Sequence, residues 1–220
     1  MNVRHSWLSV MLVLLVNGTL PVTDEPKPAA EPKPEVATAA LAVGELLPEF
    51  ESTDEQGLPW KSTDHVGKKI LVLYFYPGDF TGGCSKQARV YRDGLTKMEE
   101  LGVELVGVSG DEVATHKLFK ESFELKHSLL ADCKGELAKL VGVPVSAGGC
   151  VRGAHADRTP ILKENGTTII LKRPLTAARW TVVVGRDGKV ASIRTSVDPG
   201  TDSDEVCRIV TSIATSTATR

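Results

Sequence analysis

Two continuous apolar runs and one helical repeat mark the middle of the chain. Lys69–Tyr76 and Val103–Ser109 contain few polar residues, as in strands that are buried on both faces of a sheet. Between them, from Gly83 to Leu101-Gly102, apolar residues recur at helical spacing: Ala88, Tyr91, Leu95 and Met98. Strand, helix and strand with short connections predict a mainly parallel sheet covered by helices.

The same alternation continues toward the C-terminus. The pattern predicts a helix over His116–Phe123, a strand over Ser128–Ala131 and a helix over Gly135–Val141. Further strands are expected at Thr167–Leu171, Arg179–Val184 and Lys189–Arg194, a final helix at Ser203–Ile213, and an opening hairpin within Glu51–Trp60. The turn Gly185-Arg186-Asp187-Gly188 joins the last two strands as an antiparallel hairpin. From Val143 to Asn165 the pattern breaks, and we expect a loop-like insertion at about residues 144–166.

These elements predict one α/β domain at about residues 42–213, with a central mixed sheet flanked by helices. Residues 1–20 have the basic start and short apolar run of a secretory signal peptide, and the run is too short to span a bilayer. Residues 21–41 form a proline-rich spacer, and residues 214–220 a flexible tail. We therefore expect a soluble product exported to the periplasm or the extracellular space.

Composition narrows the possible functions. The chain has 220 residues, a formal net charge of −2, 41% hydrophobic and 25% charged residues, and no basic run that would attract nucleic acid. Its five histidines form no pair at metal-ligand spacing, so no metal is expected. No cofactor is expected either. The four cysteines form no C-x-x-C pair, which argues against a zinc ribbon and a thioredoxin-type dithiol. In an exported chain they could still form two structural disulfides.

Cys84 stands in a context that favours reactivity. It falls on the first turn of the helix that follows a buried strand, at the sheet edge where α/β proteins bind ligands. Unpaired backbone N–H groups and the helix dipole favour a thiolate there. Gly82 and Gly83 leave room for a small ligand beside the sulfur, and Thr81 can offer it a hydroxyl. An inert buried cysteine would need none of these features.

The motif Pro77-x-x-x-Thr81-x-x-Cys84, directly after an aromatic-rich strand, resembles the peroxidatic-cysteine motif of the peroxiredoxins. The closest resemblance is to the bacterioferritin-comigratory, or Q-type, group, in which the strand commonly reads Phe-Tyr-Pro-x-Asp-Phe-Thr-Pro-Gly-Cys. The similarity extends from about Leu46 to Ile209. Arg179, which begins the segment 179–188, resembles the arginine that completes the family's site.

The resemblance implies a thioredoxin-like fold and a thiol-dependent peroxidase. Cys84 would attack hydrogen peroxide or an organic hydroperoxide and become a sulfenic acid. Arg179 would hold the thiolate and stabilise charge on the peroxide, Thr81 would orient the peroxide, and Pro77 would shield the sulfur from water. A thioredoxin-like protein or a small thiol would be the reductant, and the protein would be a monomer or a homodimer.

Two residues depart from the Q-type pattern: one lies just before Cys84, and the other lies at the position of the resolving cysteine. Gly82 stands where proline is usual, which removes no chemical group. Arg89 stands where many members carry a resolving cysteine, so their local disulfide cannot form. We favour Cys150 as the resolving thiol, because the glycines before it would let its loop move.

Other cysteines and other mechanisms stay open. Cys133 begins a predicted helix, which is stiffer than the loop expected around Cys150. Cys207 lies on the apolar face of the last helix. In a one-cysteine mechanism an external thiol would reduce the sulfenic acid, and Cys133 and Cys150 would be spectators or would pair with each other.

Rival functions on the same fold are a disulfide-handling protein, a copper chaperone and a binding module without catalysis. The first would need C-x-x-C and the second C-x-x-x-C with a histidine. Gln87 and Ala88 stand where these two motifs would place the second cysteine.

Overall fold

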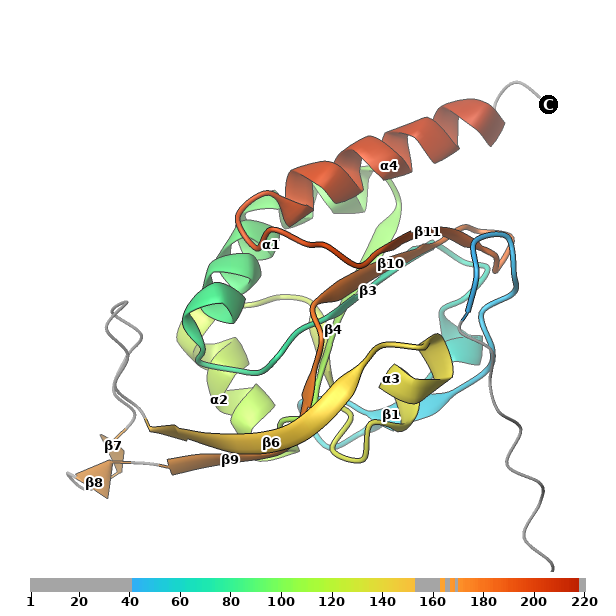
Figure 1. Cartoon of the computed structure of the whole chain (residues 1–220). Helices are drawn as coiled ribbons and strands as arrows, with labels where there is room; N and C mark the ends of the chain where they lie inside the picture. Colours follow the sequence, from blue (N-terminus) through green and yellow to red (C-terminus); the bar gives the residue numbers. More distant parts are fainter. Residues whose placement is uncertain (1–40, 153–162, 165–166, 169, 218–220) are drawn as a thin grey trace, which may run out of the picture. The chain divides into compact units, whose positions relative to one another are not determined.

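The computed structural model describes residues 41–152, 163–164, 167–168 and 170–217 (Figure 1). The chain divides into the units Met1–Val36 and Ala37–Arg220, and every described residue belongs to the second. The predicted signal peptide, nearly all of the spacer and the last residues of the tail therefore lie outside the described residues. Among the helices of the described part, none has the length and apolar character needed to cross a membrane.

A five-stranded mixed sheet forms the centre of the domain. Its order is β11 (Val190–Arg194), β10 (Trp180–Val184), β3 (Ile70–Phe75), β4 (Val103–Ser109) and β5 (Ser128–Ala131). β3, β4 and β5 are parallel, whereas β10 runs antiparallel to both β3 and β11. All six residues of β3 are buried, as its continuous apolar run predicts. The predicted α/β architecture with an antiparallel edge is confirmed.

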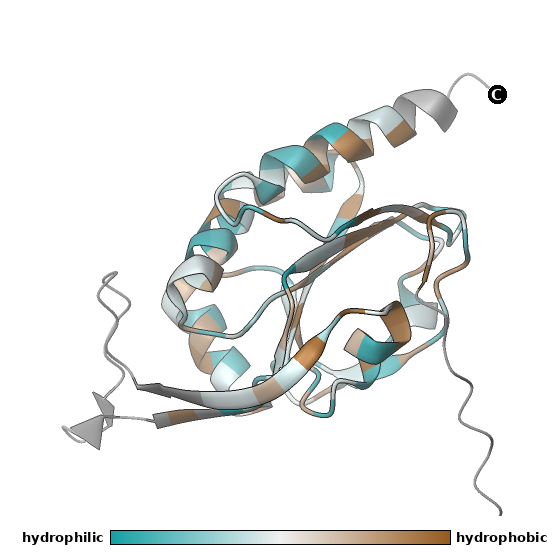
Figure 2. Cartoon of the chain, in the orientation of Figure 1, coloured by the Kyte–Doolittle hydropathy of each residue, from teal (hydrophilic) through white to brown (hydrophobic). Residues whose placement is uncertain are grey.

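Helices cover both faces of this sheet. They are α1 (Gly82–Glu100), α2 (Val113–Phe123), α3 (Glu136–Val141) and α4 (Asp202–Thr217). Tyr91 of α1 and Val206 of α4 pack against the face that carries Val72, whereas Leu137 of α3 packs on the opposite face with Leu73. Figure 2 shows hydrophilic and hydrophobic positions mixed along α1 and α4, as expected of helices with one buried side. α4 ends four residues beyond the predicted Ile213.

Shorter elements complete the domain. The predicted opening hairpin is present as β1 (Glu51–Thr53) and β2 (Pro59–Lys61), which pair antiparallel and are followed by the 3-10 turn η1 (Ser62–Asp64). β7 (Lys163–Glu164) and β8 (Thr167–Thr168) form a separate two-stranded pair.

The prediction of a loop-like stretch from Val143 is wrong for its first part. β6 (Val145–Arg152) pairs antiparallel with β9 (Ile170–Ala177), a strand that also extends well beyond the predicted Leu171. Gly148 favours the prediction of a loop here, but the strand pair requires a glycine at this position. A Cβ on Gly148 would lie 1.8 Å from the Arg173 carbonyl oxygen of β9. The glycine that suggests a loop is what lets the two backbones approach.

Candidate active site

Cys84 lies at the start of α1, after the loop that follows β3. Thr81 is the extended N-cap residue of α1, and its carbonyl accepts the Ser85 amide at 2.8 Å. Cys84 is therefore the third residue of the helix, as predicted, and its side chain is only 2% exposed. At this position the sulfur lies beside the positive end of the helix dipole.

Arg179 approaches the sulfur from the other side. It immediately precedes β10, and its Nη2 donates to Cys84 Sγ at 3.2 Å. Its Nη1 donates to Gln87 Oε1, one turn further along α1. Gly83 leaves space for the guanidinium, because a Cβ at this position would lie 3.3 Å from Nη2. The structure thus brings together two predicted site residues that are 95 positions apart.

Behind Gln87 lies a buried carboxylate that the sequence analysis missed. Asp202, the first residue of α4, is fully buried, and its Oδ2 accepts hydrogen bonds from Gln87 Nε2 at 2.8 Å and Tyr91 Oη at 2.5 Å. Thr181 Oγ1 donates to the same oxygen at 2.7 Å, and Arg194 Nη1 donates to Oδ1 at 2.5 Å. Asp202 therefore holds Gln87, which in turn contacts Arg179.

The sequence offers a weak signal for Asp202. An aspartate shortly after Pro199-Gly200 suggests the start of a helix, which Asp202 does mark. That it is buried and accepts four donors depends on residues from α1, β10 and β11, which no local pattern reveals.

Thr81 and Pro77 lie in the loop between β3 and α1. Thr81 Oγ1 donates to the Gly78 carbonyl at 3.0 Å, and the Pro77 carbonyl accepts a hydrogen bond from Arg173 Nη1 at 2.6 Å. Phe80, buried in the same loop, has a φ of +57°, which a residue with a Cβ adopts only when its surroundings hold it there.

Asp79 of the same loop forms a buried polar cluster with Tyr76 and His116. Asp79 accepts hydrogen bonds from Tyr76 Oη and His116 Nδ1, both at 2.8 Å, and His116 Nε2 faces the Leu130 carbonyl at 3.1 Å. Burial opposes a charged imidazole, but the Asp79 carboxylate outweighs it and raises the pKa of His116. Burial, with Asp79 adding to it, also raises the pKa of neighbouring Asp111 to about 6.

The other cysteines differ in their surroundings. Cys133 lies in the turn before α3 and not in a helix, which corrects the prediction, and its Sγ donates to the Asp111 carbonyl at 3.4 Å. Burial raises the pKa of Cys133 and that of Cys207, and Cys207 packs with Val206 in the core, as predicted. Cys150 lies in β6 opposite Lys172, so its backbone belongs to a paired strand and not to the expected loop.

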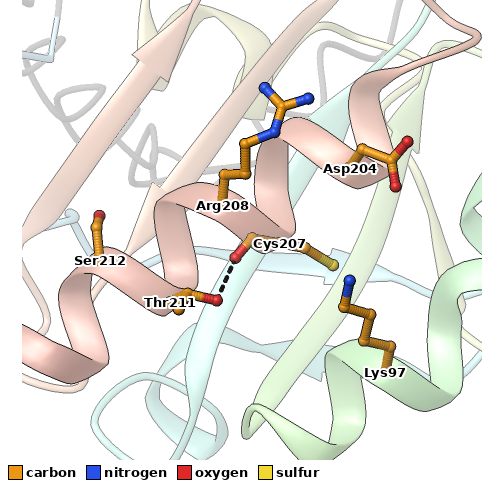
Figure 3. A pocket seen from close by; sticks show the side chains of 6 residues that line it. All are labelled: Lys97, Asp204, Cys207, Arg208, Thr211 and Ser212. Atoms are coloured by element: carbon orange, nitrogen blue, oxygen red, sulfur yellow. Dashed lines mark hydrogen bonds between the residues drawn. The ribbon is translucent and has the colours of Figure 1, made fainter.

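A cavity of about 460 Å³ lies between α1 and α4, away from the cysteine at the helix start (Figure 3). Lys97, Asp204, Cys207, Arg208, Thr211 and Ser212 line it. Lys97 is 13 positions after Cys84 on α1, about 20 Å along the helix axis. None of the predicted site residues lines this cavity.

Comparison with known proteins shows the family of this chain. The model of the AhpC/TSA family matches residues 43–193. A chloroplastic peroxiredoxin Q of Gentiana triflora is 34% identical over 150 residues, covering 66% of this chain and 67% of the relative. That of Arabidopsis thaliana is 38% identical over 133 residues, covering 60% of each.

Solved structures show the same fold. The peroxidoxin BcpB of Mycobacterium tuberculosis superimposes with a TM-score of 0.61 at 24% identity, covering 79% of this chain and 98% of that one. A Xylella fastidiosa PrxQ variant gives a TM-score of 0.62 at 20% identity, covering 80% and 99%.

Fold, site and comparisons define a thiol-dependent peroxidase with a thioredoxin-like fold. The chain belongs to the AhpC/TSA family, and its relatives include the peroxiredoxins of the Q type that the sequence motif predicted.

Proposed function

We propose that Cys84 is the peroxidatic cysteine and that it reduces hydrogen peroxide and organic hydroperoxides. The thiolate sulfur attacks the distal peroxide oxygen, so that an S–O bond forms while the O–O bond breaks. The sulfur is oxidised to a sulfenic acid, and the leaving oxygen takes one proton and departs as water or an alcohol. The observation that carries this proposal is the 3.2 Å contact between Arg179 Nη2 and Cys84 Sγ at the start of α1.

The neighbouring groups have separate roles in this step. Arg179 stabilises the thiolate and the negative charge that moves onto the peroxide oxygens. Thr81 orients the peroxide through its hydroxyl, which in the structure donates to the Gly78 carbonyl. Pro77 limits the access of water to the sulfur.

Peroxide consumption in the presence of a dithiol reductant tests the proposal. Cys84→Ser should abolish turnover without loss of the folded state, whereas Cys207→Ser changes a cysteine that lines the cavity beside Lys97, about 20 Å along α1 from Cys84, and should keep it. Turnover retained by Cys84→Ser would refute the assignment.

For the second half of the cycle we propose Cys150 as the resolving thiol. A disulfide requires Cα atoms within about 7 Å, and any movement that brings Cys150 to Cys84 would involve β6, the start of α1, or both. The pairing of β6 with β9 makes this movement more costly than the loop predicted from sequence would have allowed, which leaves a one-cysteine mechanism as the competing proposal.

A peptide map made after one equivalent of hydrogen peroxide separates the two mechanisms. A crosslinked Cys84–Cys150 peptide that is absent from Cys150→Ser supports resolution by Cys150. A trapped sulfenic acid at Cys84 without any internal crosslink in the native protein would favour the one-cysteine mechanism.

The wider context of the enzyme is also proposed from the sequence. The reductant is a thioredoxin-like protein or a small thiol, and the protein is a monomer or a homodimer, which sedimentation distinguishes. The signal pattern in residues 1–20 supports export to the periplasm or the extracellular space. N-terminal sequencing of the mature protein tests this, because an exported chain should begin after the apolar run.

A further inference from the structure

Arg173 is a buried arginine outside the set of residues that the peroxidase motif includes. It belongs to β9, and only 8% of its surface is exposed. From there it reaches the loop between β3 and α1, where its Nη1 donates to the Pro77 carbonyl at 2.6 Å. Its Nε faces Asp111 Oδ1 at 3.8 Å, as an ion pair that is too long for a hydrogen bond.

Gly78 provides the space that the guanidinium occupies. A Cβ built on Gly78 would lie 1.7 Å from Arg173 Nη1 and 2.2 Å from its Cζ. No other residue type fits at this position while Arg173 keeps its place. The loop sequence and the arginine, 95 positions apart, are therefore matched to each other.

Asp111 extends the contact to the next peptide group. Its Oδ2 accepts the Asp79 amide at 2.8 Å and the Ser109 hydroxyl at 2.7 Å. Arg173 thus holds the carbonyl on one side of Gly78, and its ion-pair partner holds the amide on the other side. The Gly78 carbonyl, which belongs to the peptide group held by Asp111, is the acceptor of the Thr81 hydroxyl.

We propose that Arg173 is a positioning residue of the peroxidase site. Together with Asp111 it fixes both peptide groups that flank Gly78, and thereby the direction of the Thr81 hydroxyl beside Cys84. Because Arg173 comes from β9, the β6–β9 strand pair is a brace for the peroxide-binding loop. This inference rests on the proposed function of Cys84.

The test compares two reactions of the same thiol. Peroxide attack requires both the thiol and a correctly oriented Thr81, whereas alkylation by iodoacetamide requires only an accessible, reactive thiol. Arg173→Met should slow the reaction with hydrogen peroxide at least tenfold and change the alkylation rate less than twofold. Arg173→Lys, which can still donate to the Pro77 carbonyl, should restore part of the loss.

A double-mutant cycle with Asp111→Asn provides the second measurement. Asparagine keeps an oxygen for the Asp79 amide but loses the charge that faces Arg173, so this variant also serves if Arg173→Met fails to fold. If the two residues act as one unit, the double variant should be no slower than the slower single variant. Lys120→Met, which breaks an unrelated ion pair with buried Glu55, is the matched control and should keep the native peroxide rate.

Three results would overturn the inference: peroxide and alkylation rates that fall together, peroxide rates that stay native, or losses that multiply in the double variant. A native protein without any peroxide reaction would instead refute the proposed function of Cys84, so the two failures are distinguishable.

Discussion

Arg179 contacts two partners with two different nitrogens, which distinguishes it from a simple positive charge near a thiol. One amino group faces Cys84 Sγ and the other faces Gln87 Oε1. The planar guanidinium can make both contacts at once, whereas a lysine ammonium on its flexible stem cannot reproduce this geometry. The identity of the residue should therefore matter, and not only its charge.

Arg179→Lys should slow the reaction with hydrogen peroxide by at least an order of magnitude, a loss of about 1.4 kcal/mol or more in the barrier. Stopped-flow measurement of the second-order rate constant checks this. Arg208→Lys, on the exposed side of α4, is the matched control and should react at the native rate. A native rate in Arg179→Lys would remove this residue from the site.

We expect Asp202 to contribute strongly to the free energy of unfolding. Asp202→Ala leaves the buried donors of Gln87, Tyr91 and Thr181 without their acceptor and Arg194 without its partner, so we expect a loss of about 3–5 kcal/mol in the free energy of unfolding. Urea unfolding measures it. Asp204→Ala, two residues further along α4 and exposed, should change stability by less than about 0.5 kcal/mol, and equal losses in both variants would contradict this account.

The sequence predicted the site residues that belong to a local pattern or a family motif. It did not predict the residues whose roles depend on tertiary contacts. Cys84 could be placed because a cysteine at a helix start after a buried strand is a local pattern. Arg179 came from the resemblance to a family. Gln87, Asp202 and Arg173 escaped notice because their roles depend on partners more than 80 positions away along the chain.

Among the elements, β6 and β9 depart most from the sequence-based prediction. The alternation of the sheet strands was readable because β3 and β4 are apolar throughout. β6 contains Ser146, Gly148 and Gly149 instead, and β9 contains Pro174, whose backbone lies close to Gly148. Glycine and proline are depleted in strands, so their presence predicts a loop where the close backbone approach in fact requires them.

The two neighbouring glycines of β6 should respond very differently to alanine. A Cβ at Gly148 would lie 1.8 Å from the Arg173 carbonyl oxygen, whereas at Gly149 no atom lies within 4 Å of the added carbon. Gly148→Ala should therefore cost about 1–3 kcal/mol and lower the hydrogen-exchange protection of β6 and β9 amides. Gly149→Ala should leave both unchanged, and similar behaviour of the two variants would contradict the described pairing.

At the scale of the whole molecule, buried His127 makes stability depend on pH. His127 contacts Tyr74 Oη through Nε2 at 2.7 Å, and burial lowers its pKa from 6.5 to about 3. Between these values the unfolded chain binds a proton that the folded protein excludes, so this residue makes stability rise with pH. Acidification from pH 6.5 to 4 should remove up to about 3 kcal/mol through His127.

Asp111 acts in the opposite direction, since its folded pKa of about 6 exceeds the unfolded 3.8 and its contribution to stability falls as pH rises between them. A comparison of variants separates the two effects. Urea unfolding from pH 7 to 4 should show a smaller acid loss in His127→Gln than in the native protein, and identical pH profiles would contradict the assignment of a neutral buried histidine.

The central claim is that a single sulfur, that of Cys84, reacts with peroxide. The reduced native protein, mixed with one equivalent of hydrogen peroxide and a sulfenic-acid trapping reagent, reveals the oxidised position when its peptides are mapped by mass spectrometry. The account predicts that Cys84 alone is oxidised first, as a trapped sulfenic acid or as one half of a disulfide. Consumption of peroxide while Cys84 remains a free thiol would contradict it.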